Sequence, residues 1–264
     1  MDRSVHGQPL RDRDFTPVEV EQVRLLLSTY CDGSGASIKK VPWTVPDYRD
    51  FERVTAAVCE GSSAEDKGIF DVSVPVPNGK PYGVSCKMAG PGLASDPLTA
   101  FMELSNSAKK FEDDFLSKGY DWINNPAHAG NAAVELVMSW HEEVRAEIDL
   151  AHSCYLLLTH STNWKKYKLS TFDLNLKHAD PKDMDWEMRR KRGTDQPNSI
   201  VGTWTNNGKT HRLWEFYPLS GGQLKYSPLW EWATWQSDWF ELEQPPQHSL
   251  ITKAQQYFPD LWKD

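Results

Sequence analysis

The chain has no run of about 18 consecutive apolar residues, so a transmembrane helix is not expected. Its start, Met1-Asp2-Arg3, is charged and no apolar stretch follows, so a secretory signal is not expected either. The cysteines are far apart and lack CxxC spacing: Cys31, Cys59, Cys86 and Cys154. This pattern favours neither a disulfide framework nor a thiolate zinc site, and we expect a cytoplasmic protein without a membrane partner.

Common catalytic motifs are also missing. The eight histidines do not cluster at metal-ligand spacing. His141 is followed by two glutamates, but no second histidine lies four residues on, which excludes a zinc-protease helix. No GxSxG, Walker A or GxGxxG motif opens a helix after a strand.

The 264 residues suffice for one large domain with a sizeable core. The net charge of −8 argues mildly against a nucleic-acid partner, but Arg189–Arg192 is a local run of four positive charges. Five of the twelve tryptophans fall within Trp214–Trp239, which indicates a second packed layer rather than a disordered tail.

A hairpin is the clearest element. Two Val- and Ile-rich runs, Ile69–Val76 and Tyr82–Met88, flank a turn that contains Asn78-Gly79. Asp71 and Lys87 interrupt these apolar runs. Burying a carboxylate and a lysine is costly unless they serve each other or a ligand.

The fold class expected is α/β (α+β): a central mixed β-sheet flanked by helices, with an added antiparallel β meander. Helices are predicted after the Thr16 cap, at 47–60, from 96 to 115, at 131–150 and at 249–257. Strands are predicted at 154–159 and 166–174, followed by a polar loop with a helical turn at 175–200 and a meander at 199–205, 209–217 and 223–226.

Asp71 and Lys87 suit phosphodiester hydrolysis. That reaction needs a divalent cation, carboxylates to hold it and a positive group near the attacking water. Mg²⁺ takes oxygen ligands and keeps several waters, so one or two carboxylates suffice. Asp71 and the backbone carbonyl of Cys86 are the candidate ligands, and Lys87 is the candidate positive group.

Phe70-Asp71 on one strand and Ser85-Cys86-Lys87 on the next make the chain resemble the PD-(D/E)xK nuclease superfamily, and within it the type II restriction endonucleases. The resemblance covers roughly residues 45–160. It implies a restriction-endonuclease-like core in which Asp71 binds Mg²⁺ and Lys87 assists the nucleophilic water.

The sequence departs from the family pattern at two places. Phe70 replaces a proline, and Ser85 replaces the second acid. Some restriction enzymes with the same Ser-x-Lys move that acid to the following helix, which makes Glu103 the second candidate metal ligand. Glu52 corresponds to an extra acid on the preceding helix, and Ser85 leaves room for the displaced carboxylate.

The resemblance implies a single nuclease domain over 1–264, with a catalytic core at about 45–160 and a DNA-contacting or oligomerising elaboration at about 175–264. Candidate contacts to double-stranded DNA are basic or amide side chains: Arg189, Arg190, Lys191, Arg192, Asn206, Asn207, Lys209 and Arg212. Ser34–Lys40 is a further candidate. Two-fold dimers usually read palindromic sites, so a homodimer or a tetramer of dimers is expected.

The sequence thus predicts a Mg²⁺-dependent, site-specific DNA endonuclease. Three alternatives stay open. Asp71 and Lys87 could form an ordinary cross-strand ion pair. Ser85 could mark a decayed site in a DNA- or protein-binding module. A nickase or repair nuclease would share the chemistry.

Overall fold

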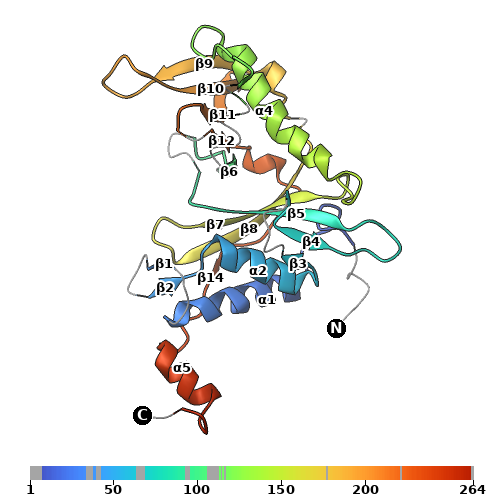
Figure 1. Cartoon of the computed structure of the whole chain (residues 1–264), viewed down its shortest axis with the longest axis vertical. Helices are drawn as coiled ribbons and strands as arrows, with labels where there is room; N and C mark the ends of the chain where they lie inside the picture. Colours follow the sequence, from blue (N-terminus) through green and yellow to red (C-terminus); the bar gives the residue numbers. More distant parts are fainter. Residues whose placement is uncertain are drawn as a thin grey trace.

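The computed structural model describes residues 8–33, 38–39, 43–63, 69–92, 96–105, 113, 115, 117–176, 178–220 and 222–262. Two large sheets form its body, a mixed sheet and an antiparallel sheet that lies above it in Figure 1. Helices α1 and α2 lie below the mixed sheet, and α4 lies against the antiparallel sheet. The expected class, a mixed sheet with flanking helices and an antiparallel meander, is confirmed.

The mixed sheet has the order β13-β8-β7-β5-β4-β3, and β14 also pairs with β8. Its strands are β3 (Ser62–Ser63), β4 (Val72–Val74), β5 (Tyr82–Ala89), β7 (Cys154–His160), β8 (Lys166–Asp173), β13 (Trp235–Gln236) and β14 (Phe240–Glu241). The β4–β5 hairpin is antiparallel, as predicted, with Asn78 at a φ of 60° in its turn. Strands β5 and β7 are parallel and joined through α4, which makes the sheet mixed.

Helices α1 (Pro17–Ser28) and α2 (Tyr48–Val58) cover one face of this sheet and confirm two predicted helices. Each begins with a capping box, Thr16 with Glu19 and Asp47 with Asp50, so the first backbone N–H groups are satisfied. Their inner faces join a core with the sheet: Val23, Leu27, Phe51, Val54, Val72, Val84, Leu156 and Leu158.

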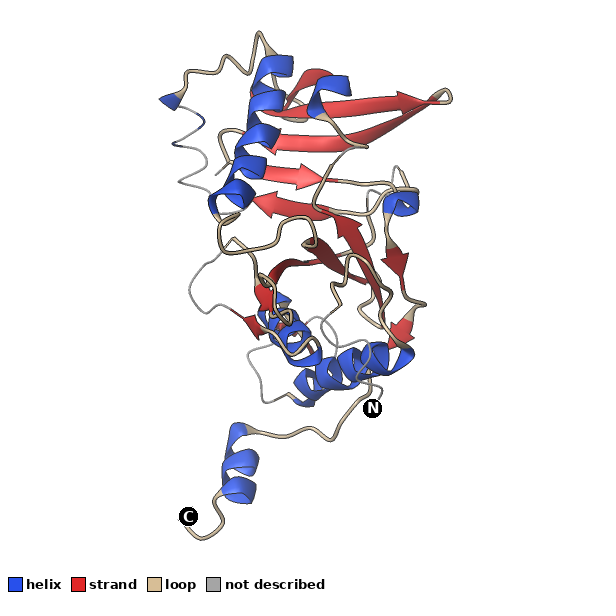
Figure 2. Ribbon diagram, turned by 90° about the vertical axis from the view of Figure 1, so that its right-hand side faces the viewer, coloured by secondary structure: helices blue, strands red, loops and turns tan. Residues whose placement is uncertain are grey.

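The antiparallel sheet has the order β6-β12-β11-β10-β9. Its strands are β6 (Met102–Ser105), β12 (Gln223–Tyr226), β11 (Lys209–Tyr217), β10 (Pro197–Asn206) and β9 (Asp185–Arg190). Helix α4 (Pro126–Glu143) packs on β9 and β10, and Figure 2 shows it crossing their strands. A Cβ on Gly130 would lie 2.4 Å from the ring of Trp186, so glycine permits this close approach.

Three predicted boundaries were wrong. Residues 102–105 form strand β6 rather than part of a helix from 96 to 115. Of the rest of that predicted helix, residues 113 and 115 are helical, and 106–112 and 114 lie outside the described residues. The predicted loop at 175–200 has its predicted helical turn in the 3₁₀ turn η2 (Pro181–Asp183), but it also contains strand β9, which was not predicted. Helix α4 begins five residues before the predicted 131–150 and ends at Glu143. Pairing of β6 with β12 and of β9 with β10 overrides the local pattern.

Smaller elements complete the chain: η1 (Thr29–Asp32), β1 (Ile38–Lys39), β2 (Thr44–Val45), η3 (Trp230–Trp232) and α5 (Leu250–Tyr257). Helix α5 confirms the predicted last helix and extends away from the body (Figures 1 and 2). None of the helices in the described part of the chain is long and apolar enough to span a membrane.

Candidate functional site

The β4–β5 hairpin positions Asp71. The sequence predicted Asp71 within a strand run at 69–76, but in the structure Asp71 directly precedes β4. Its Oδ2 accepts hydrogen bonds from the backbone N–H of Cys86, at 2.7 Å, and from Ser85 Oγ, at 3.3 Å. Since β4 and β5 pair no further than Val72 with Val84, the carboxylate replaces the next backbone partner. The side chain is thus fixed at the point where the hairpin opens.

Lys87 lies beside this carboxylate. Its Nζ is 4.0 Å from Asp71 Oδ2, and the two side chains are 20% and 27% exposed. The distance is too long for a hydrogen bond but well within ion-pair attraction. Side chains two residues apart point to the same face of a strand, so Ser85 and Lys87 share one face of β5. The Asp71 carboxylate therefore points toward the Lys87 amine rather than into bulk solvent.

Glu52, on α2, reaches the same place. Burial raises the pKa of its carboxyl to about 7, the negative charge of Asp71 adds to the rise, and the positive charge of Lys87 opposes it. Both effects require Glu52 to lie near the Asp71–Lys87 pair. The structure thus brings together two acids and an amine: Glu52 from α2, Asp71 from the residue before β4, and Lys87 from β5.

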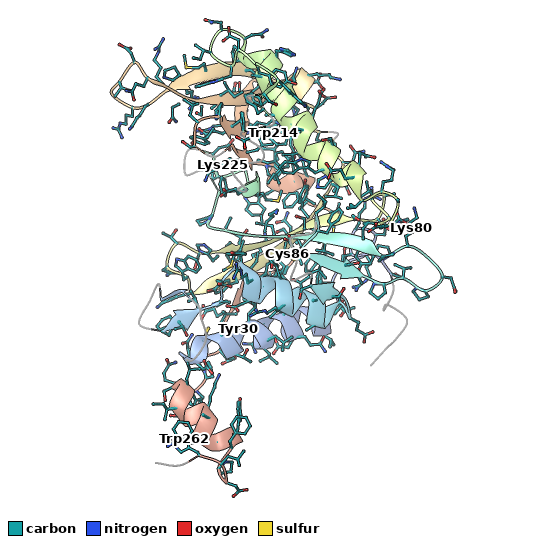
Figure 3. The ribbon with its side chains drawn as sticks, viewed as in Figure 1. Tyr30, Lys80, Cys86, Trp214, Lys225 and Trp262 are labelled. Carbon is teal, nitrogen blue, oxygen red and sulfur yellow. The ribbon has the colours of Figure 1, made fainter. Side chains whose placement is uncertain are left out.

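The backbone carbonyl of Cys86 also belongs to this group. The N–H and C=O of one strand residue point to the same side of the strand. Because the N–H of Cys86 bonds Asp71, its carbonyl is directed to that side as well. Figure 3 shows Cys86 in the layer of the mixed sheet next to α2.

The two carboxylates and the carbonyl are oxygen donors. Mg²⁺ prefers oxygen ligands and usually takes one or two carboxylates, with water in its other positions. Glu52 and Asp71 offer two carboxylates whose mutual repulsion a cation would relieve. Across the described ranges, no three His, Cys, Asp or Glu side chains gather closely enough to hold a metal ion.

Glu103 is not part of this set. It was predicted on a helix after the hairpin, but it lies on β6, opposite Lys225 of β12. Figure 3 shows Lys225 in the antiparallel sheet, well separated from Cys86. The predicted helix placed Glu103 near the start of an apolar stripe, whereas the strand assigns it to the other sheet. Glu52 therefore replaces Glu103 as the second candidate acid.

His141 is a neighbour that sequence analysis did not assign to the site. Its imidazole stacks on Phe70, with ring centroids 5.5 Å apart, and borders a cavity of about 700 Å³. Burial, together with the charge of Lys87, lowers the pKa of His141 to about 4, so the ring is neutral at pH 7. Val134, Val137 and His141 follow three- and four-residue spacing on α4, which was the available signal.

The predicted DNA-contacting residues fall into two separate groups. Arg189 and Arg190 end β9, followed by Lys191 and Arg192 in the turn to β10, whereas Asn206, Asn207 and Lys209 lie at the β10–β11 turn. These turns are at opposite ends of β10, which has ten residues and so spans about 30 Å. The two groups can bind one duplex only if the duplex runs along β10.

Several of the charges in these groups have partners within the chain. Arg189 is paired with Glu187, and Arg212, on β11, is paired with Glu215. Arg190 Nη1 donates to the backbone carbonyl of Asp195 at 2.5 Å. Lys191 and Arg192 are exposed in the turn. Of Ser34–Lys40, only Ile38 and Lys39 are within the described residues, as β1.

His211, next to the candidate DNA contact Arg212 on β11, is buried. Its Nδ1 lies 2.7 Å from Asp96 Oδ2, which ties the segment before β6 to β11. Its role is therefore structural.

Comparisons of the chain with protein-family models, with curated proteins and with solved structures find no match, so the assignment of the site depends on its own geometry.

Proposed function

We propose that the protein is a Mg²⁺-dependent endonuclease that hydrolyses phosphodiester bonds in double-stranded DNA. The observation that carries the proposal is the convergence of Glu52, Asp71 and Lys87, with Lys87 Nζ 4.0 Å from Asp71 and the pKa of Glu52 raised to about 7. Perturbed carboxylates beside a charged partner are typical of functional sites. An exposed cross-strand ion pair would not include a second, half-buried acid.

Each residue has a role in this proposal. Glu52, Asp71 and the Cys86 carbonyl would hold Mg²⁺, which would polarise the phosphate and lower the pKa of a bound water. Lys87 orients the attacking water and offsets the negative charge that develops on the phosphate. The N–H of Cys86 and the Ser85 hydroxyl keep the Asp71 carboxylate in place. Ser85 serves as a positioning residue rather than as a ligand.

The resemblance to type II restriction endonucleases supports double-stranded DNA as the substrate and a two-fold oligomer as the assembly. The parallel β5–β7 pair, the antiparallel β4–β5 hairpin and the flanking helix α2 support a restriction-endonuclease-like core. The net charge of −8 makes local basic segments such as the β9–β10 turn the DNA-facing candidates.

Incubation with mixed-sequence DNA and Mg²⁺, with EDTA as the control, tests the proposal. Discrete bands indicate a site-specific endonuclease, and a smear indicates a non-specific or repair nuclease. DNA left intact over a range of sequences, metals and protein concentrations would contradict nuclease activity.

Asp71→Asn separates catalysis from binding. The asparagine keeps the shape and an acceptor for the Cys86 N–H but lacks the charge that holds a cation. Cleavage should be lost while DNA binding is retained or strengthened, because a negative charge near phosphate is gone. Asp121→Asn, an exposed acid before α4, is the control and should cleave normally. Loss of binding together with cleavage would indicate a folding role for Asp71.

The second candidate is a catalytically decayed module that binds DNA or protein. Ser85 in place of the second acid and the net charge of −8 favour it, the charge pointing toward a protein partner. Such a module would leave DNA intact. Asp71→Asn would not change how it binds a partner, because no cation at Asp71 would be lost.

A further inference from the structure

The C-terminal arm, residues 243–262, carries an apolar surface that the body of the molecule does not cover. Its exposed apolar side chains are Leu250, Ile251, Tyr257, Phe258, Leu261 and Trp262. Leu250 is 71% exposed and Leu261 is 77% exposed. On α5 itself, residues 250, 254 and 257 follow the spacing of one helical stripe.

The arm is fixed at its root. Gln247 Nε2 donates to the Cys31 carbonyl at 2.8 Å, the N–H of His248 donates to the Asp32 carbonyl at 2.7 Å, and Lys253 pairs with Asp32 at 2.5 Å. These bonds direct α5 away from α1, and Figures 1 and 2 show it beyond the end of the body. Figure 3 labels Trp262 at the far end of the arm. The arm is thus anchored where its apolar stripe faces outward.

Helix α1, at the same end of the molecule, has an outward apolar stripe of its own. Val18, Leu25 and Leu26 are exposed, and with Gln22 they follow the spacing of one helix face. Charged side chains flank this stripe, with Arg24 paired to Glu21 and Glu243. An apolar strip with a charged border is the usual composition of a contact surface.

We propose that the arm of one copy of this chain packs its apolar stripe on the α1 stripe of a second copy, and that the second copy does the same in return. The two complementary surfaces belong to one chain and lie at one end of it, which is what a two-fold contact requires. This inference does not depend on the nuclease proposal.

The area supports a stable dimer. Six large side chains that are 39–77% exposed would bury roughly 600 Å² on each arm, taking about 150–250 Å² for a whole large side chain. Two arms contribute roughly 1,200 Å², and the exposed parts of Val18, Leu25 and Leu26 on the two α1 stripes add roughly 500 Å². The contact then buries roughly 1,700 Å², within the approximately 1,200–2,000 Å² of a standard stable interface.

Sedimentation velocity of the full chain tests the dimer. The wild-type protein should sediment as a dimer, and Leu250→Asp/Leu261→Asp should raise the dissociation constant at least about 100-fold because two charges would enter an apolar contact. Leu25→Asp on α1 should have a similar effect. Leu219→Asp, at an exposed leucine in the β11–β12 turn, is the matched control and should stay dimeric. A monomeric wild-type protein, or a dimer that the arm variants leave unchanged, would overturn the proposal.

A disulfide test identifies the surfaces. Chains carrying Leu25→Cys and chains carrying Leu261→Cys, with tags of different mass, should form a mixed covalent dimer after mild oxidation. The native cysteines are buried and so compete little. A chain with both substitutions should give covalent dimers. Covalently closed monomers instead would mean that the arm packs on its own α1, and absence of the mixed dimer would mean that it packs elsewhere; either result contradicts the proposal.

Discussion

Glu52→Gln should stabilise the metal-free protein at alkaline pH and have little effect at acid pH. The pKa of Glu52 rises from 4.5 in the unfolded chain to about 7 in the folded one, mainly through burial and then through the charge of Asp71. An acid with a raised pKa holds its proton longer in the folded state. Stability is therefore lost as the pH rises from about 4.5 through about 7.

The magnitude follows from the shift. A rise from 4.5 to about 7, at about 1.36 kcal/mol per pKa unit, gives an upper limit of about 3.4 kcal/mol. Because Glu52 is half-buried, water screens part of this cost, and we expect about 1–2 kcal/mol. Glutamine is uncharged and similar in shape, so it removes the cost. At pH 8 the free energy of unfolding should rise by that amount, and at pH 4.5 it should hardly change.

Urea unfolding in EDTA at pH 4.5 and pH 8 measures the effect. Glu147→Gln, an exposed acid after α4, is the control and should shift stability by less than about 0.5 kcal/mol at either pH. Added Mg²⁺ should stabilise wild type more than Glu52→Gln, because it compensates the Glu52–Asp71 repulsion. Equal effects of Glu52→Gln at both pH values, or destabilisation at pH 8, would refute the reasoning.

Of three further predictions, two concern the packing of the fold and one concerns DNA binding. Gly83→Ala would place a Cβ 2.2 Å from the ring of Phe70 and should cost about 1–3 kcal/mol in thermal unfolding; unchanged stability would contradict the packing. Asp96→Ala removes the hydrogen-bond partner of the buried His211 Nδ1 and should cost about 1–3 kcal/mol in thermal unfolding; a loss below about 0.5 kcal/mol would show that this bond is unimportant. Lys191→Ala should reduce the salt slope of DNA binding by about one, and an unchanged slope would place the DNA elsewhere.

Elements with strong local signals were predictable from the sequence. Capping boxes at Thr16 and Asp47 mark the starts of α1 and α2, and both appear in the structure. The turn at Asn78-Gly79 identified the β4–β5 hairpin. The apolar run from Cys154 identified β7, whose burial on both faces leaves no alternation to read.

Elements defined by distant pairing were not predictable. Strand β6 is an edge strand that pairs with β12, more than a hundred residues later in the chain, so Phe101 and Leu104 looked helical. Arg189 and Arg190, the first half of the basic run, belong to β9 because β10 pairs with them, although the composition of the run is typical of a loop. Glu103 was predicted to be a site residue because the sequence predicted a helix there, whereas residues 102–105 form strand β6.

The candidate site divides in the same way. Asp71, Ser85 and Lys87 lie within one hairpin, so the short sequence separation was enough to associate them. Glu52 joins them through the packing of α2 on the sheet, which the sequence suggested only through the family resemblance. His141 comes from helix α4, which follows the hairpin only after strand β6, and the fold was needed to locate it beside Phe70.

We propose that Lys87 acts with the two acids in DNA cleavage, and Lys87→Ala tests this role most directly. Lys80→Ala, at an exposed lysine in the same hairpin, is the matched control. With Mg²⁺ and plasmid DNA under single-turnover conditions, Lys87→Ala should cleave about 10²–10⁴-fold more slowly than wild type while binding DNA normally, and Lys80→Ala should match wild type. Cleavage by Lys87→Ala at the wild-type rate would contradict the account.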